Sequence, residues 1–184
     1  MTEVNWAGTH AYRATRIHRP STVEEVREIV ARAPRIRVLG SRHSFSDVAD
    51  SAELVTLEGL PADVVVDRDR MTVSVGAGVK YGELAEALNA EGLALHNLAS
   101  LPHISVAGAI ATATHGSGDA NSNLATAVAG LQLVTSDGEL IDVARDDADF
   151  EGLVVGLGAL GAVVRLLIHT CSTSSPQRVN TLTL

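Results

Sequence analysis

The sequence predicts an α+β fold in which a small, partly parallel sheet precedes a mostly antiparallel one. Residues 15–57 alternate between strand-like, helix-like and strand-like segments, an order that favours parallel strands joined by a helix. Residues 64–75 and 128–144 each place a polar turn between two apolar runs, which is typical of β-hairpins. With 184 residues, 46% of them hydrophobic, the chain can bury the core of one domain or of two small lobes.

Two helices are expected in the first half of the chain. Val23, Val26 and Val30 recur at helical spacing. The preceding residues 21–24 (Ser-Thr-Val-Glu) have the pattern of a capping box, in which the Ser oxygen and the Glu carboxylate satisfy first-turn N–H groups. A second helix is expected over residues 83–91, before a glycine that stops it. The strand-like runs in this half are residues 15–19, 36–39, 54–57, 64–67 and 71–75.

The second half begins with a segment of small residues. Residues 105–114 (Ser-Val-Ala-Gly-Ala-Ile-Ala-Thr-Ala-Thr) predict a helix whose small side chains let another backbone or a flat ligand approach closely. A Ser-Asp-Gly turn at residues 136–138 then predicts a hairpin. The remaining expected elements are the hairpin strands 128–135 and 139–144, a short helix over 149–154 and a final strand over 163–168.

Composition and charge argue against several classes of protein. The net charge of −8 disfavours a nucleic-acid partner, which requires a basic face. Lys80 is the only lysine among 14 basic residues, so a lysine-based phosphate site is disfavoured. Cys171 is the only cysteine, so no intramolecular disulfide is expected. Because no signal-peptide core and no run of about 18 apolar residues is present, we expect a cytoplasmic protein without a membrane partner. Residues 171–184 are expected to form a flexible tail.

A loop that follows a strand gives the clearest functional signal. In residues 35–45 a short apolar run ends in the turn Gly40-Ser41, and His43 lies two residues further on. A strand-end loop of small residues presents several backbone N–H groups to one point, and such a nest binds phosphate without a cation. A histidine beside it can serve as a nucleophile, a base or a ligand. The loop is therefore expected to hold a phosphorylated cofactor and to act on it.

Other motifs favour simpler interpretations. Residues 156–161 have the form GxGxxG, but the last acidic residue is Glu151 and residues 163–168 resemble a strand, so a glycine-rich turn is favoured over a Rossmann site. Four histidines also suggest a metal site: His43, His96, His103 and His115. They lack a tight ligand spacing, and each taken alone is most simply a hydrogen-bonded structural side chain. No Gly-x-Ser-x-Gly motif supports a serine hydrolase.

Four segments together identify a family resemblance. Two of them, 38–45 and 100–118, are rich in small and hydroxyl residues and suit a large flat cofactor clasped on both sides of its diphosphate. The others are residues 5–8 (Asn-Trp-Ala-Gly) and 157–161. In this order and combined length they make the chain resemble, over about residues 5 to 168, the PCMH-type FAD-binding domain of the vanillyl-alcohol oxidase family, and most closely that of alditol oxidases.

The resemblance implies an FAD-binding domain over residues 1–170, with FAD between a lobe of about residues 1–75 and a lobe of about 76–170. The diphosphate would lie on backbone N–H groups of residues 38–42. His43 stands where alditol oxidases carry the flavin covalently through its 8α-methyl group. The positions that match FAD-contacting residues are Val38, Leu39, Gly40, Ser41, Arg42, His43, Ser44, Ser100, Ser105, Gly108, Thr112, Ala113, Thr114, His115 and Val163.

The chain departs from the family in two respects. Arg42 stands where relatives usually have glycine, so it is strained if that position needs a positive φ, or else it brings a guanidinium to the diphosphate or the flavin edge. The match also stops near His169, before the substrate domain that supplies the catalytic residues in the family's oxidases. We therefore expect a stand-alone, redox-active FAD-binding flavoprotein with its electron donor and acceptor unknown. The alternatives are a non-catalytic remnant or subunit that needs a separate cap-like partner protein, and an alditol oxidase without a cap.

Overall fold

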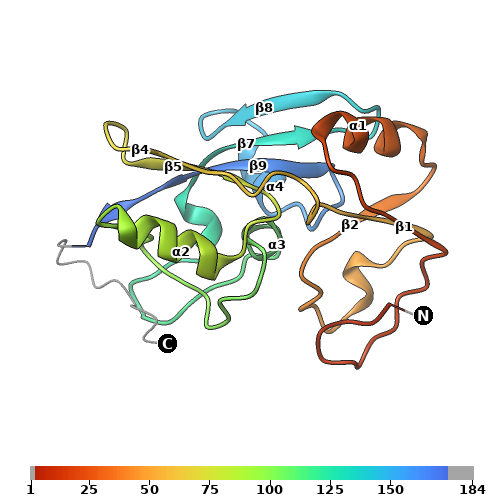
Figure 1. Cartoon of the computed structure of the whole chain (residues 1–184), viewed down its shortest axis with the longest axis horizontal. Coiled ribbons are helices and arrows are strands. Elements are labelled where there is room, and N and C mark those ends of the chain that lie inside the picture. Colours follow the sequence, from red (N-terminus) through yellow and green to blue (C-terminus); the bar gives the residue numbers. More distant parts are fainter. Residues whose placement is uncertain (1–2, 174–184) are drawn as a thin grey trace.

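Two sheets organise residues 3–173, the part of the chain that this computed structural model describes (Figure 1). The smaller sheet consists of β1 (Arg16–His18), β2 (Ile36–Leu39) and β3 (Glu53–Thr56), which run parallel in the order β1-β3-β2. The larger sheet consists of β4 (Val64–Asp67), β5 (Thr72–Gly76), β7 (Val128–Val134), β8 (Leu140–Ala144) and β9 (Ala162–His169). Its strands are antiparallel in the order β4-β5-β9-β7-β8. The predicted α+β fold is confirmed.

The helices cover both sheets. They are α1 (Val23–Arg32), α2 (Tyr81–Ala90), α3 (Val106–Ala111) and α4 (Phe150–Val154), with short 3₁₀ turns at Asp47–Ala49 and Leu124–Ala127. Figure 1 shows α2 and α3 on one side of the larger sheet, and α1 beside the ends of β7 and β8. No helix within the described residues has the length and apolar character needed to cross a membrane.

The cap of α1 differs from the expected one by a single residue. Thr22 is the N-cap, and its hydroxyl accepts a hydrogen bond from the backbone N–H of Glu25 at 3.2 Å. The Glu25 carboxylate in turn accepts from the N–H of Ser21 at 2.6 Å. The predicted box of residues 21–24 is therefore wrong in register. The next frame, Thr-Val-Glu-Glu, has the same pattern, and in the helix that follows Val26 and Val30 are buried.

The small-residue helix is shorter than predicted. It was expected over residues 105–114, but α3 ends at Ala111. The Thr112 hydroxyl donates to the carbonyl of Gly108 at 3.1 Å, and Ala113 adopts a left-handed φ of 52°, which turns the chain out of the helix. The segment therefore becomes a six-residue helix followed by a turn, because local side-chain bonds replace the last helical turn.

Two short strands were not expected. β6 (Leu93–Ala94) pairs antiparallel with β10 (Cys171–Ser172), so the first residues of the expected loose tail are held by the fold. The rest of the predicted tail, residues 174–184, lies outside the described residues. The hairpin of β4 and β5 joins the larger sheet, so the two sheets divide before residue 64. The lobe boundary at about residue 75 stays a prediction.

Two clusters of buried side chains meet along β9. Its alternating pattern buries Leu166 and Ile168 in a large cluster that includes Leu84 of α2 and Ile110 of α3. The earlier part of the same strand belongs to a second cluster, which joins α1 to strands of both sheets. The members of that cluster are Val26, Val30, Val55, Leu57, Leu60, Ala77, Val134, Ala162 and Val164. The junction of the two sheets is therefore fixed by packed apolar side chains around one long strand.

Candidate functional site

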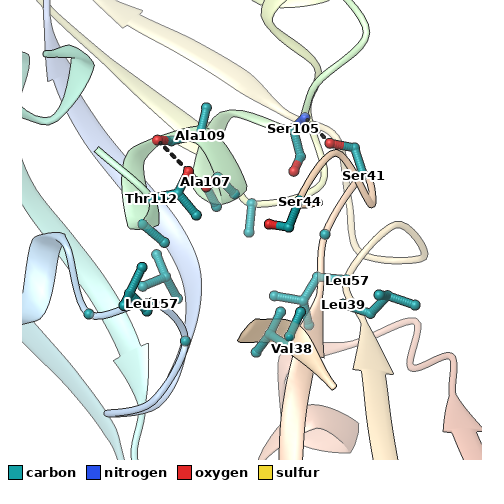
Figure 2. Close-up of a pocket in the computed structure, with 18 of the residues that line it drawn as sticks. Val38, Leu39, Ser41, Ser44, Leu57, Ser105, Ala107, Ala109, Thr112 and Leu157 are labelled. Atoms are coloured by element: carbon teal, nitrogen blue, oxygen red, sulfur yellow. Dashed lines mark hydrogen bonds between the residues drawn. The ribbon is translucent and has the colours of Figure 1, made fainter. Parts of the chain in front are cut away.

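A cavity of about 340 Å³ opens at this junction (Figure 2). Most of its walls come from the end of β2 and the loop that follows it (38–44), the residues after β3 (57–58) and after β5 (77–78), the segment 104–114 that contains α3, and the turn between α4 and β9 (156–161). In Figure 2 the side chains of Val38 and Leu57 lie opposite Leu157, with Ser41, Ser44 and Ser105 at the loop and the α3 N-terminus. A cavity of this size, with mostly apolar walls and a few polar groups, is typical of a small-molecule site.

The loop after β2 lies against the beginning of α3. A Cβ atom on Gly40 would lie 3.2 Å from the Ser105 Oγ and 3.8 Å from the Gly108 Cα, so a larger side chain would force the two segments apart. The Ser41 hydroxyl bridges them, because it accepts a hydrogen bond from the Ser105 N–H at 3.0 Å. The same hydroxyl lies 3.1 Å from the His43 Nδ1. Small residues and one serine thus hold the nest against the helix.

The loop and the helix start leave polar groups available to a ligand. Within residues 3–173, no acceptor pairs with the backbone N–H groups of Ser41, Arg42 or His43. The Ser105 hydroxyl is buried, and it too has no partner among the described residues. Buried donors without a partner are costly, so such groups point to a ligand that accepts hydrogen bonds. Converging N–H groups with a hydroxyl are the donor set that suits a phosphate oxygen.

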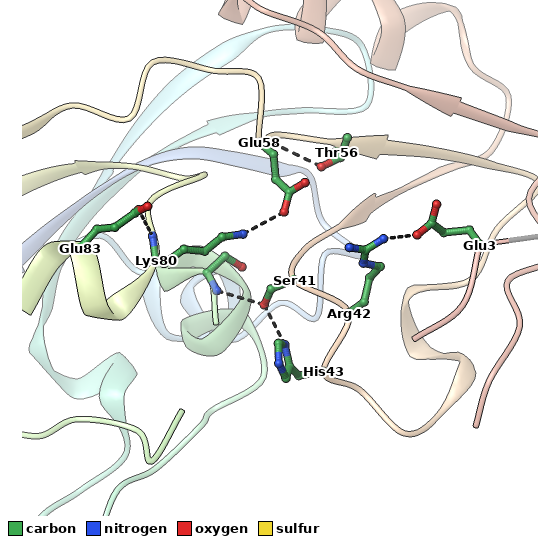
Figure 3. A network of polar contacts seen from close by, with 9 residues as sticks. Glu3, Ser41, Arg42, His43, Thr56, Glu58, Lys80 and Glu83 are labelled. Carbon is green, nitrogen blue, oxygen red and sulfur yellow. Dashed lines mark hydrogen bonds and ion pairs between the residues drawn. The ribbon is translucent and has the colours of Figure 1, made fainter. Parts of the chain in front are cut away.

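The cations near the loop are already paired (Figure 3). The Lys80 ammonium lies 2.8 Å from the Glu58 carboxylate. The hydrogen bond from Lys80 lowers the pKa of Glu58, so that carboxylate stays charged and keeps its partner. The Arg42 guanidinium pairs with Glu3. An anion in the cavity would therefore be held mainly by oriented amides, as the scarcity of lysine led us to expect.

Arg42 itself has the backbone conformation that glycine prefers. Its φ is 63°, which is the left-handed region that costs a side chain roughly 1–2 kcal/mol. Its carbonyl accepts a hydrogen bond from the Trp6 N–H at 2.8 Å. The strain expected at this position is therefore present, and the guanidinium points to Glu3 (Figure 3).

His43 lies in a cluster of three rings, which we call the ring cluster: Trp6, His43 and His103. The centroid of His43 is 5.2 Å from that of Trp6 and 4.7 Å from that of His103. The His43 Nε2 is buried and has no hydrogen-bond partner among the described residues. Burial lowers the pKa of His43, and His103 lowers it further. The imidazole is therefore neutral at pH 7, the form that acts as a nucleophile.

Twelve of the fifteen predicted site residues line this one cavity. They are Val38, Leu39, Gly40, Ser41, Arg42, His43, Ser44, Ser105, Gly108, Thr112, Thr114 and Val163. Ser100, Ala113 and His115 do not line it. Ser100 is exposed, Ala113 forms the left-handed turn after α3, and the Nδ1 of His115 lies 3.0 Å from the Gly116 carbonyl oxygen.

The turn of residues 156–161 lines the cavity, although the sequence predicted only a structural turn there. It has three left-handed positions, Leu157, Gly158 and Gly161, with φ of 53°, 65° and 152°. The Leu157 N–H donates to the Ala111 carbonyl at 3.1 Å, which ties the turn to the end of α3. The glycine pattern was the available signal. Ala77 and Gly78 also line the cavity, and no motif marked them.

Comparison with known proteins agrees with this geometry. Residues 14–144 match the family model described as FAD binding domain. The chain is 48% identical to an alditol oxidase of Streptomyces over 168 residues, which cover 89% of this chain and 40% of that protein. It is 34% identical over 171 residues to an L-gulono-1,4-lactone dehydrogenase of Mycobacterium tuberculosis and 33% identical over 185 residues to the L-gulonolactone oxidase of Mus musculus. These matches cover 90% and 94% of this chain, and 40% and 42% of those proteins.

The family match extends over more than half of the chain, so the chain belongs to the FAD-binding domain family. Its small parallel sheet and larger antiparallel sheet are those of the PCMH-type FAD-binding fold. The chain spans about two fifths of the length of the relatives that it matches. The unpaired N–H groups and the Ser105 hydroxyl fit the diphosphate of FAD, and the apolar walls fit its flat rings.

Proposed function

We propose that the cavity binds FAD with its diphosphate on the loop of residues 40–44 and the start of α3. The observation that carries this proposal is the meeting of unpaired backbone N–H groups with the buried, unpartnered Ser105 hydroxyl. Gly40 and Gly108 let the ligand reach these donors, because a Cβ on Gly108 would lie 2.7 Å from the Ser105 Oγ. The other predicted contact residues that line the cavity stay part of the proposed site, and so do Ser100, Ala113 and His115, which lie outside its lining.

We further propose that His43 holds the flavin covalently. Its neutral imidazole offers a nitrogen lone pair, and the N–C bond to the 8α-carbon replaces one N–H and one C–H bond. Formation of this bond would release two protons and two electrons, and dioxygen would have to accept the electrons. The Ser41 hydroxyl beside Nδ1 orients the ring for this bond.

Bound FAD supplies two-electron redox chemistry. For the whole protein we propose an oxidoreductase, because the printed names of its relatives are those of an alditol oxidase and of sugar-lactone oxidases and dehydrogenases. We propose that residues 1–184 hold the flavin without further chain and exchange electrons with a separate donor and acceptor. A cytoplasmic location belongs to the same proposal, since the only cysteine is a free thiol.

The test is the colour of the acid-precipitated protein. Purified protein supplied with FAD should give a yellow pellet, and His43→Ala should give a colourless pellet with a yellow supernatant. A colourless wild-type pellet would contradict the covalent bond but leave binding intact. Protein that binds no flavin at all would overturn the proposed site. If His43→Ala keeps a yellow pellet, the attachment residue is another histidine, with His103 and His115 the next to replace.

A second measurement distinguishes the electron-transfer role from that of a subunit. Flavin reduction by a small reductant and reoxidation by dioxygen, followed by absorbance, should proceed with the purified chain alone. A stoichiometric partner protein that is required for turnover would favour a subunit with a separate cap. Peroxide release from an alditol at the rate of a normal oxidase would instead support an oxidase that works without a cap.

A further inference from the structure

Residues 3–13, which we call the N-terminal segment, hold the loop that contains His43 at the residues on both sides of the histidine. The Trp6 N–H donates to the carbonyl of Arg42 at 2.8 Å, and the Asn5 Nδ2 donates to the carbonyl of Ser44 at 3.1 Å. The residues before and after His43 are therefore both bound to one short segment. Glu3 adds an ion pair to the Arg42 guanidinium (Figure 3).

The N-terminal segment also has hydrogen bonds of its own. Asn5 is buried, and its Oδ1 accepts hydrogen bonds from the N–H groups of Thr9 at 2.8 Å and His10 at 3.0 Å. The indole of Trp6 has 59% of its surface exposed, so core burial does not hold it in place. Its position is set by the backbone bonds around it and by the stack on His43, with 24° between the ring planes.

His103 reaches the ring cluster from another part of the chain. The carbonyls of Pro102 and Ile104, on either side of it, accept hydrogen bonds from the N–H groups of Gly82 at 2.8 Å and Tyr81 at 3.0 Å. These bonds attach the loop of His103 to the first turn of α2. The His103 ring lies 5.6 Å from Trp6 as well as 4.7 Å from His43. Three separate segments thus bring three rings into mutual contact.

We propose that Trp6 and His103 are positioning residues that clamp the His43 imidazole, keep it neutral and fix its orientation for attachment to FAD. This inference rests on the covalent attachment proposed above. A ring that is already stacked before FAD binds has less rotational freedom to lose when the bond forms, and a ring shielded from water resists protonation. The charged or titratable groups that act on His43 are His103, Lys80 and Arg42, and the last two carry their partners Glu58 and Glu3.

The sign of the electrostatic effect follows from these contacts. Burial lowers the pKa of His43, and His103, Lys80 and Arg42 lower it further, so removal of His103 or of the Trp6 indole that stacks on the ring should raise it. A higher pKa leaves less neutral imidazole at a given pH. The acid limit of covalent attachment should therefore move to higher pH in Trp6→Ala and in His103→Gln.

The test measures the rate of covalent attachment after FAD is added to the flavin-free full chain, at a series of pH values. Trp6→Ala and His103→Gln should slow attachment roughly 10- to 100-fold at neutral pH, the size of effect that misplacement of a reacting group produces. Trp6→Phe, which keeps a stacking ring, should recover much of the rate. The matched controls are Phe45→Ala, an exposed aromatic two residues from His43, and His169→Gln, an exposed histidine on β9. Both should attach FAD at the wild-type rate.

A measurement without flavin distinguishes an effect of Trp6 and His103 on the His43 ring from an effect on folding. NMR titration of the His43 ring in the flavin-free chain should give a higher pKa in Trp6→Ala and His103→Gln than in the wild type and the controls. If Trp6→Ala does not fold, His103→Gln and Trp6→Phe still decide the result. The inference would be overturned if these variants attached FAD at the wild-type rate, with the same acid limit and the same pKa of the His43 ring. The proposed covalent attachment would still hold in that case, provided that the wild-type protein binds FAD covalently. Wild-type protein without covalent flavin would overturn the attachment and the inference with it.

Discussion

Ser105 combines a structural cost with a proposed use. Its backbone N–H is paired with Ser41, but its buried hydroxyl has no partner among the described residues and makes no capping bond to α3. A buried hydroxyl without a partner costs about 1–3 kcal/mol. Such a cost is understandable where a ligand supplies the missing acceptor, and the loop of residues 40–44 lies directly beside it.

Ser105→Ala should therefore have opposite effects on the free and the loaded protein. Without flavin, the free energy of unfolding should rise by about 1 kcal/mol, because the unpaired group is gone. In a His43→Ala background, where FAD exchanges freely, affinity for FAD should fall roughly tenfold or more, the worth of one hydrogen bond to a charged group. Urea denaturation and fluorescence titration measure the two effects. Lower stability in the absence of FAD would show that the hydroxyl has a partner after all.

Arg42 offers a separate test of backbone strain. Arg42→Gly and Arg42→Ala both remove the ion pair with Glu3, but only glycine adopts φ of 63° without cost. The glycine variant should be more stable than the alanine variant by about 1 kcal/mol. Because both variants lack the ion pair with Glu3, its loss cancels in the difference between their free energies of unfolding. Comparison of either variant with the wild type would not separate the ion pair from the backbone strain. Equal stability of the two variants would mean that the loop relaxes out of the left-handed conformation.

The turn between α4 and β9 shows how one element depends on its neighbours. Gly161 has φ of 152°, and a Cβ there would lie 2.6 Å from the Val134 carbonyl oxygen and 2.8 Å from the Leu133 side chain. Gly152, on the exposed face of α4, has open space around its Cα. The two glycines of the same region therefore differ in what an added methyl group meets.

Alanine substitution should separate these two positions. Gly161→Ala should lower the free energy of unfolding by roughly 1–3 kcal/mol, because the methyl group strains the backbone against β7. Gly152→Ala should leave it unchanged or raise it by up to about 1 kcal/mol through helix propensity. Thermal and chemical denaturation of the pair give the comparison. A Gly161→Ala protein as stable as the wild type would show that the turn can shift away from β7.

Buried hydrogen bonds and ion pairs, as well as apolar clusters, stabilise the molecule around its cavity. Asp50 provides one example, because its carboxylate accepts hydrogen bonds from the backbone N–H of Arg13 at 3.0 Å and from the Arg13 Nε at 2.8 Å. Burial acts to raise the pKa of Asp50, but the hydrogen bonds from Arg13 outweigh it and the pKa lies below its usual range. The N-terminal segment is thereby joined to the turn that precedes β3.

Stability should therefore fall in acid. A carboxyl whose pKa is lowered by folding stabilises the fold above its unfolded pKa of about 3.9, and this contribution is lost as pH falls through the folded pKa. Asp50→Asn should lower the melting temperature at pH 7, and its difference from the wild type should shrink below about pH 4. Asp69→Asn, on the exposed β4–β5 turn, is the control and should change little. A difference that stays constant down to pH 2.5 would contradict the assignment.

Local patterns in the sequence were sufficient for most of the elements. The bounds of β2 and β4 agree with the prediction, and the order of the predicted strands, helices and hairpins is confirmed from β1 to β9, with the short strand β6 added. Each of these elements is specified by side chains a few positions apart, as in the valines of α1 or the Ser-Asp-Gly turn before β8. The two hydroxyl-rich segments likewise predicted most of the site residues that line the cavity, because the ligand-facing residues of a loop are neighbours in the chain.

Contacts between distant segments were set by the three-dimensional packing. The β6–β10 pair, the place of Gly161 in the cavity wall and the contacts of Trp6 and His103 with His43 have no periodic signal. Each forms because the fold brings together parts of the chain that the sequence leaves far apart. The amino-acid sequence thus indicated most of the residues that we propose to hold a phosphorylated flavin. The packing of the two sheets specifies which of them face the same cavity and which rings surround the histidine.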